Sequence, residues 1–235
     1  MAIAYKSAGP GAATNSLGSP LVVQAPATVD ANDILLLHAW HDDTVIDLAP
    51  TSGGWTLIAG PYDGPGRDWV WGKIAAGNED SANYTMQTGQ NTAVRIARIY
   101  SFSGYEGGAI ADLITGVSTE GGSGATISDD DVTTPVDGCD AINLYICNIG
   151  ETWTPTNTGV SGGTWVENVD QFSTLLGGDG TIAIQTCELA LVGTIGGGSR
   201  VRGGSSNWRM IGFSIRPGDA NPEVEQVFAM DTGGW

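Results

Sequence analysis

The stretch that decides the fold is Gly53–Gly77, which reads GGWTLIAGPYDGPGRDWVWGKIAAG. Its Pro- and Gly-rich centre predicts a turn between two short strands. The second strand carries large side chains on both faces, with Trp69 and Trp71 on one face and Val70 and Ile74 on the other. Because successive residues of a strand point to opposite faces, this strand needs cover on both sides. The sequence therefore predicts a layered β-structure.

The composition favours strands over helices and limits the classes of partner. The chain has 235 residues, which suits one large all-β domain or two small ones. Hydrophobic residues make up 41%, charged residues only 15%, and there are 36 glycines, a balance typical of many short strands and tight turns. With 26 acidic and 9 basic residues the formal net charge is −17, so we expect no nucleic-acid partner.

The number of cysteines and the N-terminal residues indicate the cellular compartment in which the protein is made. Three cysteines are too few and too odd in number for a disulfide scaffold, so buried, reduced thiols are expected. The N-terminus shows neither a basic leader nor an uninterrupted apolar run, and no window approaches membrane-spanning length. We therefore expect a protein made in a cytoplasm, with no membrane partner.

Strand-like patterns occur in both halves of the chain in the same order. In the first half they cover residues 33–40, 54–60, 68–75, 83–88 and 93–104. Their counterparts in the second half cover residues 140–149, 162–169, 180–190 and 207–217. The spacing between counterparts drifts by only a few residues, which indicates an internal pseudo-repeat with loops of unequal length.

The pseudo-repeat predicts an antiparallel β-sandwich or jelly roll. Each half is too small to cover both of its own faces, so we expect the halves to contribute to both sheets. The alternative is a tandem pair of independent small sandwiches. A single intertwined domain is favoured because no linker divides the halves, and residues 118–135 resemble a loop leading into a polar strand.

Flexible arms are predicted at both ends of the sandwich domain, which spans residues 21–217. Residues 1–20 are small and interrupted by Gly and Pro, which predicts an N-terminal arm. Residues 218–235 are acidic and then apolar, which predicts a C-terminal arm that returns onto its own domain or holds a neighbour. The residues expected to contact a partner are Tyr5, Val224, Val227, Phe228, Met230 and Trp235.

No motif of the chain assigns a catalytic, cofactor or metal site. A spacing of three residues places His38 and His41 on opposite faces of a strand, which disfavours joint metal binding. The GVSGG segment at residues 159–163 lacks the strand–turn–helix context of a serine nucleophile. The acidic runs at 42–47 and 129–131 lack the spacing of a calcium loop and favour solvated loops.

Two tryptophans are candidates for a ligand-binding loop. Trp40 and Trp153 are predicted to lie at strand ends or in loops, whereas most other tryptophans fall within strand patterns. A flat ring can stack on a sugar face, and Trp153 in GETWTPTNTG is the better placed of the two. The alternative role is structural, because a Trp beside a Pro also anchors a loop onto a sandwich.

Several motifs, read in order, resemble a jelly-roll-like β-sandwich family of tailed-phage virion accessory and decoration proteins, also seen in secreted bacterial surface proteins. The motifs are DILLLHAW (33–40), PTSGGWTLI (50–58), WGKIAAGNE (71–79), YT (84–85), IARIYSFSG (96–104) and IGFSIRP (211–217). The resemblance covers roughly residues 20 to 217 and brings no catalytic residue. In place of the Pro-Ala-Gly usual before the tryptophan, this chain has PTSGG, and it shows no leader of the secreted kind.

The resemblance implies a non-enzymatic virion structural protein, assembled in the host cytoplasm. A capsid decoration protein is the first expectation, working as an oligomer that binds the major capsid protein or other virion proteins. The alternative is a carbohydrate- or receptor-binding domain of a phage tail fibre or tail component, with sugar held by loops around Trp40 and Trp153.

Overall fold

The computed structural model describes residues 2–43, 47–87, 93–128, 131–148, 153–156, 164–173, 180–188, 192–196 and 199–217. Strands make up nearly all the regular structure in these ranges, with one helix of four residues, α1 (Ile110–Leu113). The predicted all-β, antiparallel, sandwich-like fold is confirmed.

The chain folds as two consecutive units. Strands of the first unit are β1 (Ala4–Ala8), β2 (Ala12–Thr14), β3 (Leu21–Gln24), β4 (Ile34–His41), β5 (Thr56–Gly64), β6 (Gly66–Ile74), β7 (Asn83–Met86) and β8 (Arg95–Ser103). Strands of the second unit are β9 (Ile114–Ser128), β10 (Val132–Thr134), β11 (Asp140–Cys147), β12 (Trp153–Thr156), β13 (Val166–Ser173), β14 (Gly180–Glu188), β15 (Gly193–Ile195) and β16 (Ser199–Ile215).

The two units repeat one strand order, as the pseudo-repeat predicts. The main sheet of the first unit runs β1-β8-β4-β6-β5, and β2 also pairs with β8. The main sheet of the second unit runs β12-β16-β11-β14-β13, and β9 also pairs with β16. A small sheet accompanies each main sheet, β3-β7 in the first unit and β10-β15 in the second. The first strand of each unit thus lies beside its last strand, which is a jelly-roll-like arrangement.

One expectation about the repeat is wrong, because the halves do not exchange strands between sheets. Each half builds its own main sheet and its own small sheet. Strands close in sequence pair with little loss of chain entropy, so each unit completes its hydrogen-bonded ladders locally. The units are nevertheless not independent, because their main sheets pack face to face.

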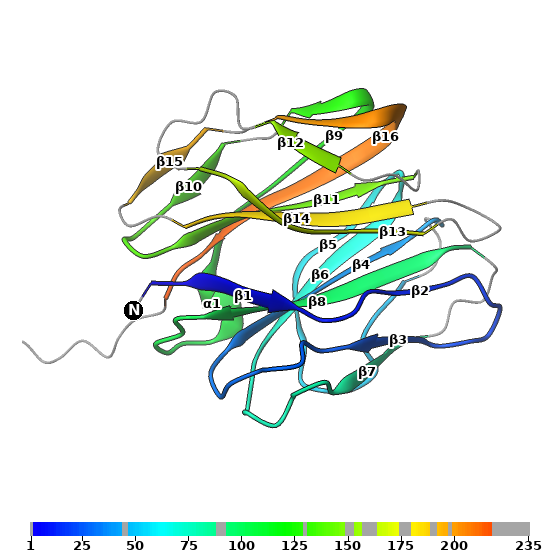
Figure 1. Cartoon of the computed structure of the whole chain (residues 1–235). Helices are drawn as coiled ribbons and strands as arrows, with labels where there is room; N and C mark the ends of the chain where they lie inside the picture. Colours follow the sequence, from blue (N-terminus) through cyan, green and yellow to red (C-terminus); the bar gives the residue numbers. More distant parts are fainter. Residues whose placement is uncertain are drawn as a thin grey trace, which may run out of the picture.

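Four layers therefore stack in the order β3-β7, first main sheet, second main sheet, β10-β15 (Figure 1). The central core joins both units and contains Ile34, Leu36, Tyr100, Phe102, Ile142, Leu144, Ile211 and Phe213, among others. The second core lies under β3-β7 and contains Leu21, Val23, Trp69, Trp71, Tyr84 and Met86. A third, under β10-β15, contains Val132, Ala141, Trp165, Cys187 and Ile195.

These cores explain the double-sided apolar pattern of β6. Val70 faces the second unit, while Trp69 and Trp71 stack at 6.0 Å under the small sheet. Burying each large side chain contributes roughly 2–3 kcal/mol, so both covers matter for stability. All three cysteines are buried and free, as predicted.

The first 20 residues depart from the prediction of an arm. β1 and β2 pair with β8 at the edge of the main sheet, and Ile3 is fully buried. Lys6 lies 2.6 Å from carboxylate oxygens of Asp30 and Asp33, which fastens the strand to the loop before β4. The edge ladder of β8 supplies the hydrogen bonds that short strands cannot supply alone. The predicted C-terminal arm, residues 218–235, lies outside the described residues.

A second difference concerns residues 118–128, which were predicted as part of a loop. They belong to the long strand β9, which pairs with β16 over most of its length. Glycines at 121 and 122 hide this strand from a pattern search, because they carry no side chain to show alternation.

Candidate functional site

Trp40 is a core residue, and the prediction that it is free to bind a ligand is wrong. It lies inside β4 and is fully buried, packed with Val94, Ile96, Ile146 and Ile182 from both units. Its indole N–H donates to the carbonyl of Pro65 at 2.6 Å. β4 continues to His41, so Trp40 sits within the strand rather than at its end.

The other predicted contact residues have different outcomes. Tyr5 lies on β1, half-buried, with its ring edge against Phe102 at a centroid distance of 5.6 Å. Trp153 belongs to β12, whose backbone pairs with β16, but its side chain lies outside the described residues. The tail residues Val224, Val227, Phe228, Met230 and Trp235 lie outside the described residues as well.

The two histidines serve different structural roles on opposite faces of β4. His38 is completely buried, and neither ring nitrogen has a hydrogen-bond partner among the described residues. Burial lowers the pKa of His38 to about 3, so the ring stays neutral. His41 accepts a hydrogen bond at Nδ1 from the backbone N–H of Asp43. In the part of the chain that the structure describes, no three His, Cys, Asp or Glu side chains gather as a metal cluster.

The motif residues PTSGGW, WGKIAAGNE and YT meet in one cluster around Lys73. Its ammonium lies 3.1 Å from Glu79 Oε1 and stands over the rings of Trp55 and Tyr84, at 5.8 and 5.2 Å. Glu79 also accepts hydrogen bonds from the backbone N–H groups of residues 76–78. Burial opposes ionisation of Glu79, but these hydrogen bonds and Lys73 outweigh it, so its pKa is lowered.

Within the same cluster, Gly53 has a φ of +98°, and a Cβ there would lie 2.8 Å from the Tyr84 ring. Only glycine combines this backbone conformation with such a close ring. The motif cluster is therefore a structural clamp that fixes the loops at one end of the small sheet. Its residues belong to the motifs that carry the resemblance.

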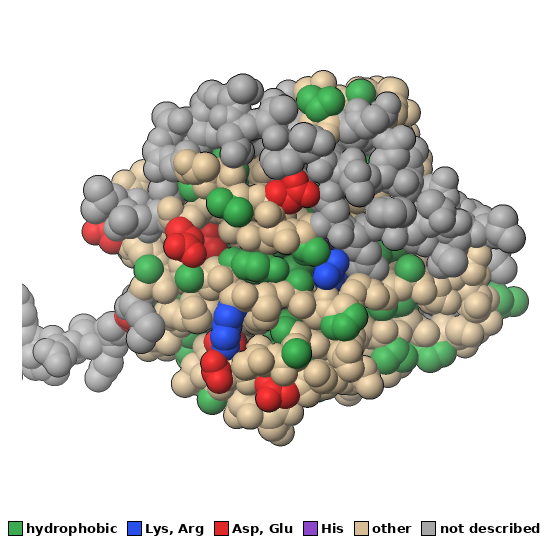
Figure 2. Space-filling model, viewed as in Figure 1, with side chains coloured by type: hydrophobic (Ala, Val, Ile, Leu, Met, Phe, Trp, Pro, Cys, Tyr) green, Lys and Arg blue, Asp and Glu red, His purple; other side chains and the backbone are tan. Residues whose placement is uncertain are grey.

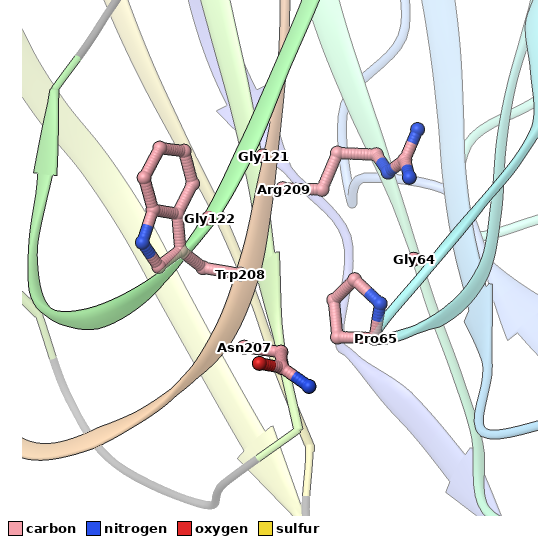
Figure 3. A pocket seen from close by; sticks show the side chains of 7 residues that line it. All are labelled: Gly64, Pro65, Gly121, Gly122, Asn207, Trp208 and Arg209. Atoms are coloured by element: carbon pink, nitrogen blue, oxygen red, sulfur yellow. The ribbon is translucent and has the colours of Figure 1, made fainter.

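A pocket of about 380 Å³ opens where the β5–β6 turn of the first unit meets β9 and β16 of the second. We call it the turn pocket. Its lining residues are Gly64, Pro65, Gly121, Gly122, Asn207, Trp208 and Arg209. In Figure 3 the Arg209 side chain reaches toward Gly64 and Pro65, whereas the Trp208 ring lies on the other side of its strand. The polar side-chain groups among the lining residues are the Asn207 amide, the Trp208 indole N–H and the Arg209 guanidinium.

Arg209 brings a charge to the border between the units. Its Nε lies 3.7 Å from Oδ1 of Asp68, and its guanidinium stands over the Tyr62 ring at 5.7 Å. Burial raises the pKa of Asp68 to about 8, and the attraction of Arg209 offsets this only in part. At 3.7 Å no hydrogen bond joins the two, and burial keeps Asp68 mostly protonated at neutral pH. Chemically, the turn pocket suits a small ligand with an acceptor or a negative group.

A second pocket of about 380 Å³ lies at the other end of β11, on the seam between the main sheets. We call it the seam pocket. Its lining residues are Tyr5, Thr164, Val166, Asn168, Thr186 and Glu188. Tyr5 comes from the first unit and the rest from the second, so this pocket contains the one predicted partner-contact residue that the structure describes with its side chain.

Sequence reasoning missed Arg209, Asp68 and Glu188 as site residues. The available signal was a charged residue inside an otherwise apolar strand, as in NWRMIGFSIRP. No protein-family model, curated protein or solved structure matches the chain. Among the described residues, no helix has the length and apolar character needed to span a membrane.

Proposed function

We propose that the chain is a non-enzymatic structural protein of a phage particle, a decoration protein that binds the capsid lattice as an oligomer. The observation that supports this best is the duplicated sandwich with shared and covered sheet faces. Its main sheets bury each other, and a small sheet covers each outer face. Rims, sheet edges and pockets are left for partners, which suits a rigid building block.

The charge of the chain fits the same proposal. A formal net charge of −17 keeps separate copies soluble and discourages nonspecific binding to nucleic acid during assembly. The motifs that carry the family resemblance supply the residues of the clamp around Lys73, so their role in this chain is to stabilise the fold.

Binding to capsids that lack the protein tests the proposal. The purified chain is incubated with such capsids, which are then sedimented and imaged by electron cryomicroscopy. We expect saturable binding with density at symmetry-related positions on the lattice. Absence of binding, or density confined to the tail, would contradict a head decoration protein.

Removal of residues 218–235 tests the predicted C-terminal arm. We expect weaker capsid binding and an unchanged thermal unfolding midpoint, because the deletion leaves every strand up to the end of β16 at Ile215 intact. Equal capsid affinity of the truncated and full chains would refute a role of this segment in attachment.

A receptor- or carbohydrate-binding tail component is the second candidate, and the turn pocket favours it. Arg209 and the Asn207 amide present donors at a surface cavity of ligand size. A glycan array with the wild type, Arg209→Ala and Trp153→Ala separates the two functions. Sugar binding that either substitution abolishes would favour the tail component, and its absence with capsid binding present would favour decoration.

A further inference from the structure

The seam pocket combines oxygen-rich side chains with an exposed apolar one. Glu188 and Thr164 are exposed, and Val166 is 53% exposed. Asn168 donates from Nδ2 to Thr186 Oγ1 at 2.8 Å, which leaves its carbonyl oxygen as an acceptor. Figure 2, viewed as in Figure 1, shows hydrophobic side chains near the middle of one face of the molecule, acidic side chains above and below them, and Lys or Arg side chains beside them. The lining thus offers acceptors and a short apolar wall.

A second carboxylate lies directly behind this lining. Asp140 of β11 is the cross-strand partner of Glu188 of β14, so both side chains project from the same face of the sheet. Asp140 is fully buried, and neither of its carboxylate oxygens has a hydrogen-bond partner among the described residues. Burial, and then repulsion from Glu188, raise the pKa of Asp140 well above its ordinary value, and the nearby backbone N–H groups of Cys187 and Tyr5, which fall outside hydrogen-bond geometry, offset this only in part.

No described Lys or Arg forms an ion pair with either carboxylate. Lys6 of β1 pairs with Asp30 and Asp33 instead, and Arg98, whose charge acts on Tyr5, donates to the carbonyl of Gly9. Two neighbouring acids without a cation repel each other when both are charged, so the buried Asp140 favours its neutral form. A positive group entering the pocket would pair with Glu188 and relieve this repulsion.

We propose that the seam pocket binds a lysine or arginine side chain of a partner protein. The identity of that partner as a virion protein rests on the proposed function. Glu188 at the mouth attracts the charged end. The exposed Val166 side chain and the Tyr5 ring pack against the aliphatic stem of a basic residue.

The size of the pocket argues for a side chain rather than a bare metal ion. A calcium ion needs six to eight oxygen ligands at about 2.3–2.6 Å, whereas the cavity encloses about 380 Å³. That volume accommodates an elongated organic cation.

Titration of the purified full chain with n-butylamine and agmatine, which mimic the two side chains, tests the inference directly. Nuclear magnetic resonance should show saturable shifts confined to the residues around the seam pocket. Glu188→Gln should weaken the binding of both probes by about tenfold or more. Glu167→Gln is the matched control, because it removes the same charge from a β13 position whose partner, Gln185, faces away from Glu188.

The outcomes separate this inference from the proposed function. Amine binding that Glu188→Gln weakens and Glu167→Gln leaves unchanged supports the pocket, even if the chain never binds capsids. Equal capsid binding by the wild type and Glu188→Gln, with no amine binding, overturns the pocket and leaves decoration standing. Shifts produced by calcium chloride but not by the amines would also overturn the inference.

Discussion

Replacement of Trp40 by alanine tests the packing between the two units. The side chain is fully buried, contacts residues of both units and donates a hydrogen bond to Pro65. A buried tryptophan removes about 200 Å² from water, worth about 5 kcal/mol at 25 cal/mol per Å². Measured costs of such truncations are about 3–5 kcal/mol, and the lost hydrogen bond is already part of that range. We expect Trp40→Ala to lower the free energy of unfolding by about 3–5 kcal/mol.

Two further variants separate the contributions to this loss. Trp40→Phe keeps most of the ring but loses the indole N–H, so we expect a loss of about 1–2 kcal/mol. Leu57→Ala is the control, because Leu57 is 47% exposed on an edge strand, and we expect a change of about 0.5 kcal/mol or less.

Urea unfolding followed by circular dichroism measures all three variants at equilibrium. Since a domain of this kind is stable by only about 5–15 kcal/mol, Trp40→Ala should shift the midpoint strongly. A loss below about 1 kcal/mol for Trp40→Ala would refute the buried position. It would also restore Trp40 as a candidate for the surface that binds sugars.

Two substitutions and one labelling experiment test other buried side chains. Glu79→Gln should cost about 1–3 kcal/mol in urea unfolding at neutral pH, because it weakens hydrogen bonds to Lys73 and the backbone. Since the folded pKa of Glu79 is lowered, this contribution disappears as the pH falls below the ordinary value of 4.5, and the two proteins should converge there. The folded pKa of Asp68 is raised from 3.8 to about 8, so wild-type stability should fall with rising pH across that window, by at most about 1.4 kcal/mol per unit. Asp68→Asn should flatten this dependence in urea titrations at several pH values, and an unchanged slope would contradict the raised pKa. All three buried cysteines should resist a thiol reagent in the native protein and react in denaturant, and rapid native labelling would contradict their burial.

Strand positions in this chain could be predicted because the signal is local. The runs that became β4, β6, β8, β11 and β14 are apolar and bounded by Gly, Pro or Asp, and each alternates or buries both faces. The order of these runs also revealed the duplication. The pattern of apolar side chains indicates which faces of a strand are buried, whichever strand it pairs with.

Which strands pair with one another could not be predicted, because the signal in the sequence is local. The two-sided apolar pattern of β6 is satisfied equally by strands of either half, so it could not exclude an exchange of strands between the halves. Short edge strands such as β2, with the sequence AAT, carry too few large side chains to show a period. Their stability comes from the ladder with β8, which is a tertiary contact.

The candidate sites depend even more on contacts between distant residues. Arg209 and Asp68 belong to different units and meet only because the main sheets stack. Asp140 and Glu188 look like ordinary strand-end residues in the sequence, and their pairing appears only with the register of β11 and β14. The prediction that Trp40 lies at a strand end is wrong because β4 extends one residue further, to His41, than the apolar pattern indicates.

The two pockets lie where the apolar contact between the duplicated units ends. In the middle of β11, Ile142 and Leu144 face the first unit and belong to the central core. Beyond one end of that apolar stretch, Asp140 lies opposite Glu188, and toward the other end Ile146 lies beside Arg209. Apolar side chains seal the two sheets against water in the middle of the interface, whereas the pockets open beside polar residues at its two ends. One end of the interface is therefore lined by carboxylic acids, and the other carries Arg209 beside the buried Asp68, so the two pockets differ in charge although they border the same strand, β11.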